Sequence, residues 1–193
     1  MFISGDQVNQ QGVYNVKLYK NGLPLTIMID DKLPSTTNST LVFAKAVDNV
    51  FWPALLEKAY AKIHGSYESI KSGHSSEVLR DLTGAPTFTH KTDEDNLFAR
   101  IKEAANNGFL MTAGGIELKE SWFKKNILRI DEQKKMDDLG IVPSHAYGLI
   151  DAVEVIDKYK RRVQLLNLRN PWGSFEWKGP WGRDCPNWTD DLK

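Results

Sequence analysis

The expected fold of the C-terminal half follows from residues 140–173, GIVPSHAYGLIDAVEVIDKYKRRVQLLNLRNPWG. Its two apolar-rich runs, 146–156 and 162–169, predict a pair of antiparallel strands joined by a polar turn. His145 stands immediately before the first run, and Asn170 stands immediately after the second. Because paired strands of a hairpin bring their outer ends together, we expect His145 and Asn170 to lie close to each other.

An asparagine beside a histidine has a known chemical use. If the side-chain oxygen of Asn170 accepts a hydrogen bond from the ring of His145, it fixes the tautomer and the orientation of the imidazole. This is the role of the third member of a Cys-His-Asn catalytic triad. Trp172, packed over the pair, would exclude water and strengthen that bond. The alternative is an ordinary Asn-Pro turn that is covered by a core tryptophan.

The three other histidines have weaker contexts. His64 follows an apolar helical pattern and is expected at the C-terminal end of a helix, facing its dipole. His74 and His90 are expected in polar loops. The single cysteine, Cys185, excludes an internal disulfide framework and a multi-cysteine zinc site, and it is compatible with a reducing cytosol. We therefore expect a cytoplasmic protein.

The N-terminal half predicts a hairpin and a core helix. Residues 13–20 and 23–30 alternate apolar and polar side chains around Asn21-Gly22, which is the strongest short-range hairpin signal. A third apolar run, 41–47, predicts another strand. Residues 51–63 place apolar side chains on one helical stripe, so we expect an amphipathic helix there.

Shorter elements are expected between these two parts. A short helix should end at Gly84, and a second helix should run from about 95 to 106 after an acidic cap that begins at Thr92. Residues 109–113 predict a buried strand, and the polar stretch 117–140 predicts a solvated connector. Because no regular βαβ alternation occurs, the expected class is α+β with an antiparallel sheet.

The composition excludes some function classes. The 193 residues carry 25 Lys+Arg and 25 Asp+Glu, so a formal net charge of zero gives no reason to expect nucleic acid or an anionic membrane as partner. No apolar run reaches the length of a membrane span, and the start, MFISGDQVNQQG, is not typical of a signal peptide.

Several stretches of the chain together match a known family in order. They are GVYNVKLYKNGLPLTIMIDDKLP, LVFAKAVDNVFWPALLEKAYAKIHGSYESI, SEVLRDLTGAP, GIVPSHAYGLIDAVEV and VQLLNLRNPWGSFEWKGPWG. The chain resembles the second subdomain of the catalytic core of calpains, over residues 1–193, with the C-terminal edge expected to be truncated. The resemblance implies a papain-like cysteine protease half with an antiparallel sheet or barrel and flanking helices. It also implies that His145 is the general base, Asn170 its orienting residue and Trp172 the lid over both.

The resemblance also implies a missing part. In calpains the nucleophilic cysteine and an oxyanion-hole glutamine belong to the first subdomain, and the cysteine stands in a Gly-Asp-Cys-Trp type motif that this chain lacks. Cys185 follows Asn170 and by position is not that nucleophile. We expect part of an intracellular endopeptidase that acts on protein substrates, is inactive alone, and has the cysteine-bearing first subdomain of the same parent protein as partner. The alternative is a catalytically dead binding or scaffold module.

The resemblance implies a calcium question as well. Calpains that respond to calcium bind one ion in this subdomain through acidic residues after the NPWG motif, which makes Glu176 and Asp184 candidate ligands. Arg183 stands where an aspartate is common, and a cation at a ligand position argues against a normal site. No cofactor is expected for this chain with certainty, and calcium remains an option for the full-length protein. Ser144 is a further departure, because calpains often have glycine before the histidine.

Overall fold

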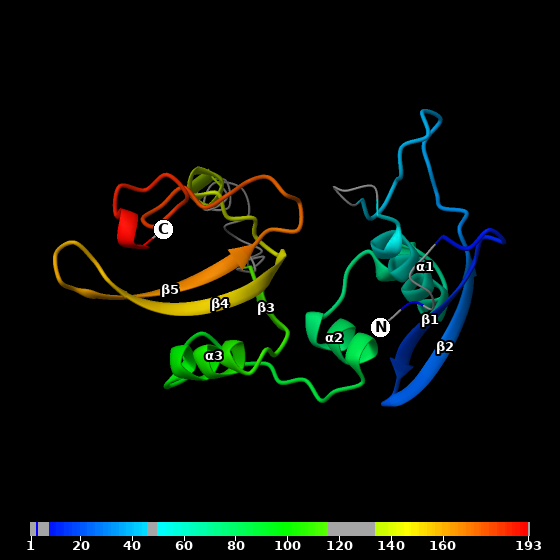
Figure 1. The fold of residues 1–193 in the computed structure, drawn as a ribbon, viewed down its shortest axis with the longest axis horizontal. Coiled ribbons are helices and arrows are strands. Elements are labelled where there is room, and N and C mark those ends of the chain that lie inside the picture. The colour runs from blue at the N-terminus through cyan, green and yellow to red at the C-terminus, as the bar shows by residue number, and fades with distance from the viewer. Residues whose placement is uncertain (1–2, 4–7, 46–49, 116–133, 193) are drawn as a thin grey trace, which may run out of the picture. The chain divides into compact units, whose positions relative to one another are not determined.

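The computed structural model describes residues 3, 8–45, 50–115 and 134–192 (Figure 1). Within it the chain divides into two compact units, Met1–Thr89 and His90–Lys193. Each unit has its own sheet and its own helices. This division is finer than the single subdomain expected for residues 1–193, and the assignment of the chain to a second subdomain stays a prediction.

The first unit is built on the predicted N-terminal hairpin. Strand β1 (Val13–Lys20) pairs antiparallel with strand β2 (Leu23–Asp30), in a register that runs from Val13 opposite Asp30 to Lys20 opposite Leu23. Asn21 and Gly22, at the turn, have φ values of 51° and 78°. Two central residues with positive φ define the turn type that matches strand twist, which is why Asn-Gly predicted this hairpin.

Helix α1 (Trp52–His64) covers the hairpin and completes the core of this unit. Its buried Leu55 and Ala59 pack with Val16 and Leu18 of β1. Burying a leucine or valine side chain contributes about 1.5–3 kcal/mol, so this small cluster is the main stabilising feature of the unit. The predicted helical stripe is thereby confirmed.

Helix α2 (Ser75–Thr83) ends at Gly84, which has a φ of 72° as expected for a helix stop. The strand predicted over 41–47 is wrong in its described part. Leu41 makes only an isolated bridge with Ser35, and the N–H of Ala44 donates to the carboxylate of Glu57 instead of to a neighbouring strand. Residues 46–47 lie outside the described residues.

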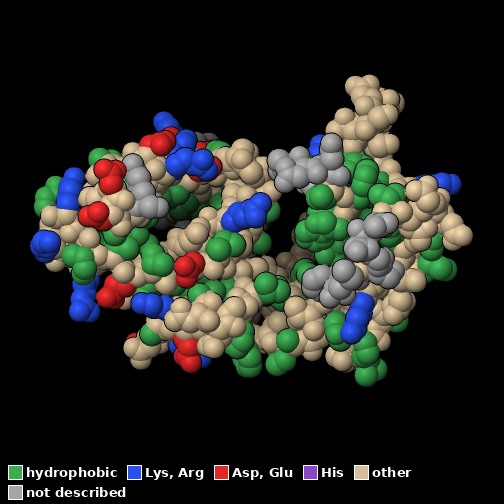
Figure 2. All heavy atoms as spheres, in the orientation of Figure 1, with side chains coloured by type: hydrophobic (Ala, Val, Ile, Leu, Met, Phe, Trp, Pro, Cys, Tyr) green, Lys and Arg blue, Asp and Glu red, His purple; other side chains and the backbone are tan. Residues whose placement is uncertain are grey.

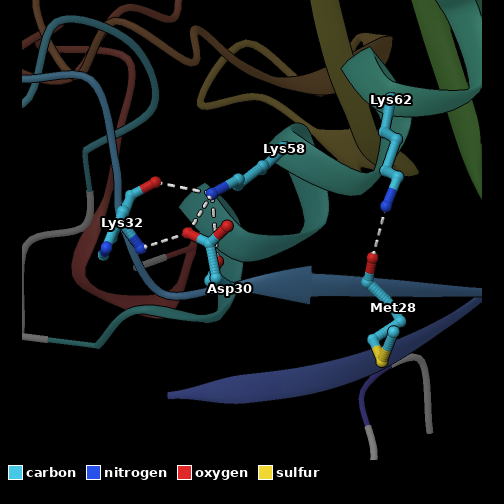
Figure 3. Close-up of polar contacts among 5 residues, drawn as sticks. All are labelled: Met28, Asp30, Lys32, Lys58 and Lys62. Atoms are coloured by element: carbon cyan, nitrogen blue, oxygen red, sulfur yellow. Dashed lines mark hydrogen bonds and ion pairs between the residues drawn. The ribbon is translucent and has the colours of Figure 1, made fainter.

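Two lysines of α1 bind the outer edge of β2 (Figure 3). Lys58 Nζ donates to the backbone oxygens of Asp30 at 3.1 Å and of Lys32 at 2.6 Å, and to the Asp30 carboxylate at 2.7 Å. One helical turn further, Lys62 Nζ donates to the backbone oxygen of Met28 at 2.8 Å. The bonds from the Lys58 side chain and from the Lys32 N–H lower the pKa of Asp30.

The second unit contains a three-stranded antiparallel sheet in the order β3-β4-β5. Its strands are β3 (Met111–Gly114), β4 (Ala146–Ile156) and β5 (Arg162–Arg169), and β4 carries an irregularity between Leu149 and Asp151. The predicted bounds of the two long strands are confirmed. So is the α+β class with antiparallel sheets, although among the described residues neither sheet closes into a barrel.

Helix α3 (Leu97–Asn106) packs against β4 (Figure 1). It begins two residues later than predicted because Asn96 takes a positive φ of 58°, which ends any helical path from Thr92. The polar connector expected over 117–140 lies largely outside the described residues, and its last part, 134–139, is helical. Among the described helices, none combines the length and the apolar character needed to cross a bilayer.

Both signs of charge lie side by side on the unit that carries β4 and β5. On the face shown in Figure 2, lysine and arginine side chains alternate with aspartate and glutamate over this sheet and its connections. A mixed surface of this kind matches the formal net charge of zero. It gives this face no single-sign field that would attract a polyanion.

Candidate active site

The open end of the β4–β5 hairpin brings His145 and Asn170 together. Gly148 near the start of β4 is opposite Arg169 at the end of β5, so the residues just outside these strands are neighbours. His145 Nε2 lies 2.9 Å from Asn170 Oδ1. The proximity expected from the hairpin is therefore present, while the catalytic roles of the two residues stay a prediction.

The amide of Asn170 is held in one orientation by four hydrogen bonds. Its Nδ2 donates to the backbone oxygens of Ser174 at 2.9 Å and of Phe175 at 3.2 Å. Its Oδ1 accepts from the N–H of Trp172 at 3.1 Å, which leaves the same oxygen to face His145. A flipped amide would lose three of these bonds, so the oxygen is the acceptor toward the imidazole.

This orientation determines the tautomer of His145. Asn170 Oδ1 has no hydrogen to give, so Nε2 of His145 must donate in the 2.9 Å bond. In the neutral ring the lone pair then resides on Nδ1. Nδ1 is thus the ring nitrogen that is left with a lone pair, and its use as a base stays a prediction.

Trp172 packs against the imidazole. The two ring centroids are 4.5 Å apart with the planes tilted by 46°, and Tyr147 meets the same imidazole edge-on at 5.0 Å. Trp172 remains 61% exposed. It therefore restricts the rotation of the ring in the described chain, and its expected role in shielding the pair from water stays a prediction.

The backbone that presents His145 is held by contacts of Gly115 and Tyr147 that the sequence did not predict. Gly115 N–H donates to the oxygen of His145 at 2.6 Å, and a Cβ on Gly115 would crowd the oxygen of Val142. The hydroxyl of Tyr147 accepts from the N–H of Val142 at 2.8 Å. One signal for Tyr147 was available, because residues i and i+2 of a strand share a face.

Ser144 has a φ of 50°, in the left-handed region that favours glycine. The serine at this position, noted as a departure from the family pattern, thus stands where a glycine would be free of strain. Such a conformation costs about 1 kcal/mol for a residue with a side chain.

The other titratable candidates lie elsewhere. His64 Nε2 is 3.2 Å from the buried Asp81, and His90 Nδ1 is 2.8 Å from Glu94. His74 precedes α2 as its N-terminal flanking residue. Cys185 lies in a series of turns, where its N–H donates to Gly182 and its oxygen accepts from Trp188.

Among the described residues, Glu176 and Asp184 do not gather with further acidic side chains into a calcium site. Arg183 binds the carboxylate of Glu176 at 2.5 Å, so a cation already occupies that oxygen. Within the part of the chain that the structure describes, no three His, Cys, Asp or Glu side chains gather in a way that could hold a metal. Calcium takes about six to eight oxygen ligands, and among the described residues neither Glu176 nor Asp184 lies in a group of acidic side chains that could supply them.

Comparison with known proteins identifies the family of the chain. The model of the family described as "Calpain family cysteine protease" matches residues 2–193. The chain is 34% identical over 186 residues to calpain-9 of Mus musculus, covering 94% of this chain and 25% of that protein. It is 34% identical over 185 residues to the calpain-1 catalytic subunit of Rattus norvegicus, with 95% and 24% covered.

Calpain-B of Drosophila melanogaster is 35% identical over 190 residues, which cover 94% of this chain and 19% of that protein. The chain thus spans about a quarter or less of the length of the curated relatives it matches. The family match extends over nearly all residues, and the His145–Asn170 pair lies within it. By this match the chain belongs to the calpain family of cysteine proteases.

Proposed function

We propose that this chain supplies the general base and its orienting residue to a calpain-like cysteine endopeptidase that cleaves proteins. His145 is the base, Asn170 orients it, and Trp172 shields the pair. The observation that carries the proposal is the 2.9 Å bond between His145 Nε2 and an Asn170 amide whose other bonds leave only its oxygen facing the ring.

The proposed reaction is acyl transfer. Nδ1 of His145 takes the proton of a cysteine thiol, and the thiolate attacks the carbonyl carbon of the scissile peptide bond. The imidazolium then gives this proton to the leaving amine as the C–N bond breaks, which leaves a thioester. Water, deprotonated by the same nitrogen, hydrolyses the thioester and restores the thiol. Asn170 keeps Nε2–H directed away from the reacting atoms throughout.

The thiol is proposed to come from outside this chain. Cys185 is the sole cysteine of the sequence, and its backbone bonds hold it in the turns at 182–188. We infer that a cysteine-bearing first subdomain of the same parent protein supplies both the thiol and the remaining oxyanion donors. On this proposal the chain alone is inactive, the parent protein works in the cytoplasm, and any calcium dependence resides in ligands that other parts of the parent provide.

The test mixes this chain with the separately expressed cysteine-bearing subdomain of a calpain relative and measures turnover of a fluorogenic peptide. Turnover should require both parts. His145→Ala should lower it about a thousandfold or more, because the base is lost. Cys185→Ser should leave it unchanged.

Two other results would change the assignment. Hydrolysis by this chain alone that Cys185→Ser abolishes would show that the nucleophile is Cys185. Association of the two parts without turnover, with the added cysteine intact and reactive, would support the alternative of a binding or scaffold module.

A further inference from the structure

The orientation of Asn170 depends on the loop that follows it. Two of the four bonds of its side chain end on the backbone oxygens of Ser174 and Phe175. If residues 174–175 moved away, Nδ2 would lose both acceptors, and the preference for directing Oδ1 toward His145 would weaken. Whatever fixes this loop therefore also fixes the tautomer of the proposed base.

Backbone contacts fix one side of the loop. Lys178 N–H donates to the oxygen of Leu139 at 2.9 Å. Gly140 has a φ of 73°, and a Cβ at that position would collide with the backbone oxygen of Glu176. Residues 176–178 therefore lie directly against 139–140, so the loop has one anchored side.

The other attachment is an ion pair. Arg183 Nη2 lies 2.5 Å from a carboxylate oxygen of Glu176, which connects the far end of the loop to the residue next to Phe175. Phe175 itself has a φ of 65°, a conformation that costs free energy and persists only when its neighbours hold it. The Glu176–Arg183 pair is one charged contact placed to do this, and the Lys178 ammonium, 5.7 Å from the centroid of the Phe175 ring, is another.

We propose that Arg183 is a positioning residue for the His145–Asn170 pair, acting as a cation built into the chain that closes the 174–183 loop without calcium. The inference rests on the proposed function, since it concerns the orientation of the proposed base. The residues present do not fit a calcium site, and a divalent ion would first have to displace the guanidinium from Glu176. An arginine stays charged at all physiological pH, so the loop remains closed whatever the calcium concentration.

The exposure of the pair makes the proposal distinguishable from a general stabilising role. The two side chains are 74% and 51% exposed, and an ion pair this exposed contributes little to global stability. Its removal should therefore change the local order of the loop and of His145 while the melting temperature hardly changes. A purely structural role would predict the reverse.

The experiment uses the chain as it exists and follows the Nε2–H proton of His145 by NMR. Arg183→Ala should raise the exchange rate of this proton with water by about two- to fivefold, because the bond to Asn170 is populated less. Arg183→Lys should retain most of the protection. Arg183→Glu should lose it, and the double variant Glu176→Arg with Arg183→Glu should recover it.

The matched control is Arg162→Ala. Arg162 pairs with Glu154 at 3.5 Å and is also exposed. It lies at the closed end of the β4–β5 hairpin, away from His145. This variant should leave the His145 proton unchanged. Millimolar calcium added to the unsubstituted chain should leave the exchange rate unchanged, and titration calorimetry should detect no heat of calcium binding.

Two results would overturn the proposal. One is an unchanged His145 proton in Arg183→Ala and Arg183→Glu. The other is calcium binding by the unsubstituted chain that displaces Arg183 and tightens the His145 bond. Neither depends on turnover, so a failure of the proposed protease activity would be recognised separately, in the experiment that mixes the two subdomains.

Discussion

At each end of the β4–β5 hairpin, one polar side chain holds the surrounding backbone through several hydrogen bonds, and the side chain differs between the two ends. At the closed end, Asp157 is 6% exposed and accepts hydrogen bonds from the N–H groups of Tyr159 and Arg161 and from the Arg161 guanidinium. At the open end, Asn170 is half-buried and both donates and accepts. Each side chain organises the few residues around it through several bonds.

Asp157 and Asn170 differ in charge and in whether a group beside them is left free for chemistry. The carboxylate of Asp157 can only accept hydrogen bonds. The groups of Tyr159 and Arg161 that donate to it hold the turn closed. The neutral amide of Asn170 can give its two hydrogens to the loop and its oxygen to His145, which leaves one imidazole nitrogen for chemistry. We therefore predict that the closed end mainly contributes stability and that the open end mainly contributes the orientation of His145.

The largest effect should follow from removing the acceptor at the closed end. Asp157→Ala should lower the melting temperature of the His90–Lys193 unit by roughly 8–15 °C, because the turn loses all the side-chain bonds that organise it. Tryptophan fluorescence measures this, since Trp172, Trp177, Trp181 and Trp188 all lie in this unit. A change of only one or two degrees would contradict the division of roles.

Acid should weaken the closed end selectively. Burial opposes ionisation of Asp157, but the bonds from Arg161 and Tyr159 outweigh it and lower the pKa below its ordinary value of 3.8. A group with a lowered pKa in the folded state stabilises above its unfolded pKa, and this stabilisation is lost as the pH falls through the lower folded value. The melting temperature should therefore fall as the pH drops below about 4, and Asp157→Asn should flatten this pH dependence. Equal slopes in both proteins would refute this account.

A smaller loss of stability is expected at the open end. Asn170→Ala removes neutral, half-exposed hydrogen bonds worth about 1 kcal/mol in net free energy, or roughly 4–8 °C in melting temperature for a unit of this size. In the mixed two-subdomain assay the same variant should lose far more turnover than this small loss of stability would suggest. If stability fell as much as in Asp157→Ala, the contrast between the two ends would disappear.

The smallest effect concerns strain, and the hairpin offers a matched pair. Ser144, next to the open end, and Lys160, in the closed turn, have φ values of 50° and 61°. Ser144→Gly and Lys160→Gly should each raise the free energy of unfolding by up to about 0.5 kcal/mol, since relief of strain slightly exceeds the entropy lost with glycine. Melting curves check both. A drop in stability for Ser144→Gly alone would show that its side chain has a role of its own.

The regular elements were predictable where the periodicity was long or the turn chemistry was specific. The bounds of β4 and β5, the Asn21-Gly22 hairpin and the helix that starts near Trp52 all followed from alternation or helical spacing. The meeting of His145 with Asn170 followed from the same strand pairing. In each case the local pattern and the tertiary packing favour the same structure.

The remaining features depend on contacts between distant residues. The run at 41–47 is apolar enough for a strand, yet Ala44 is bound by Glu57 of α1. Gly115, which bonds His145, lies 30 residues away in the sequence, and no spacing rule connects the two. The stretch 84–95, GAPTFTHKTDED, has the Gly, Pro and polar residues typical of a linker, yet a single subdomain was expected over the whole chain, so the two units were missed.

The lysines that reach β2 have a consequence for the behaviour of this chain in concentrated solution. A strand with a free edge is a template on which another chain can add a strand, and this is how many proteins aggregate. Lys58 and Lys62 bind the backbone oxygens of Met28 and Asp30 along that edge with charged groups, and Lys58 also binds the oxygen of Lys32 just beyond the strand. Acetylation of these two lysines would remove both the charge and most of the donors. The free edge of β2 would then offer its backbone oxygens to a strand from another copy of this protein.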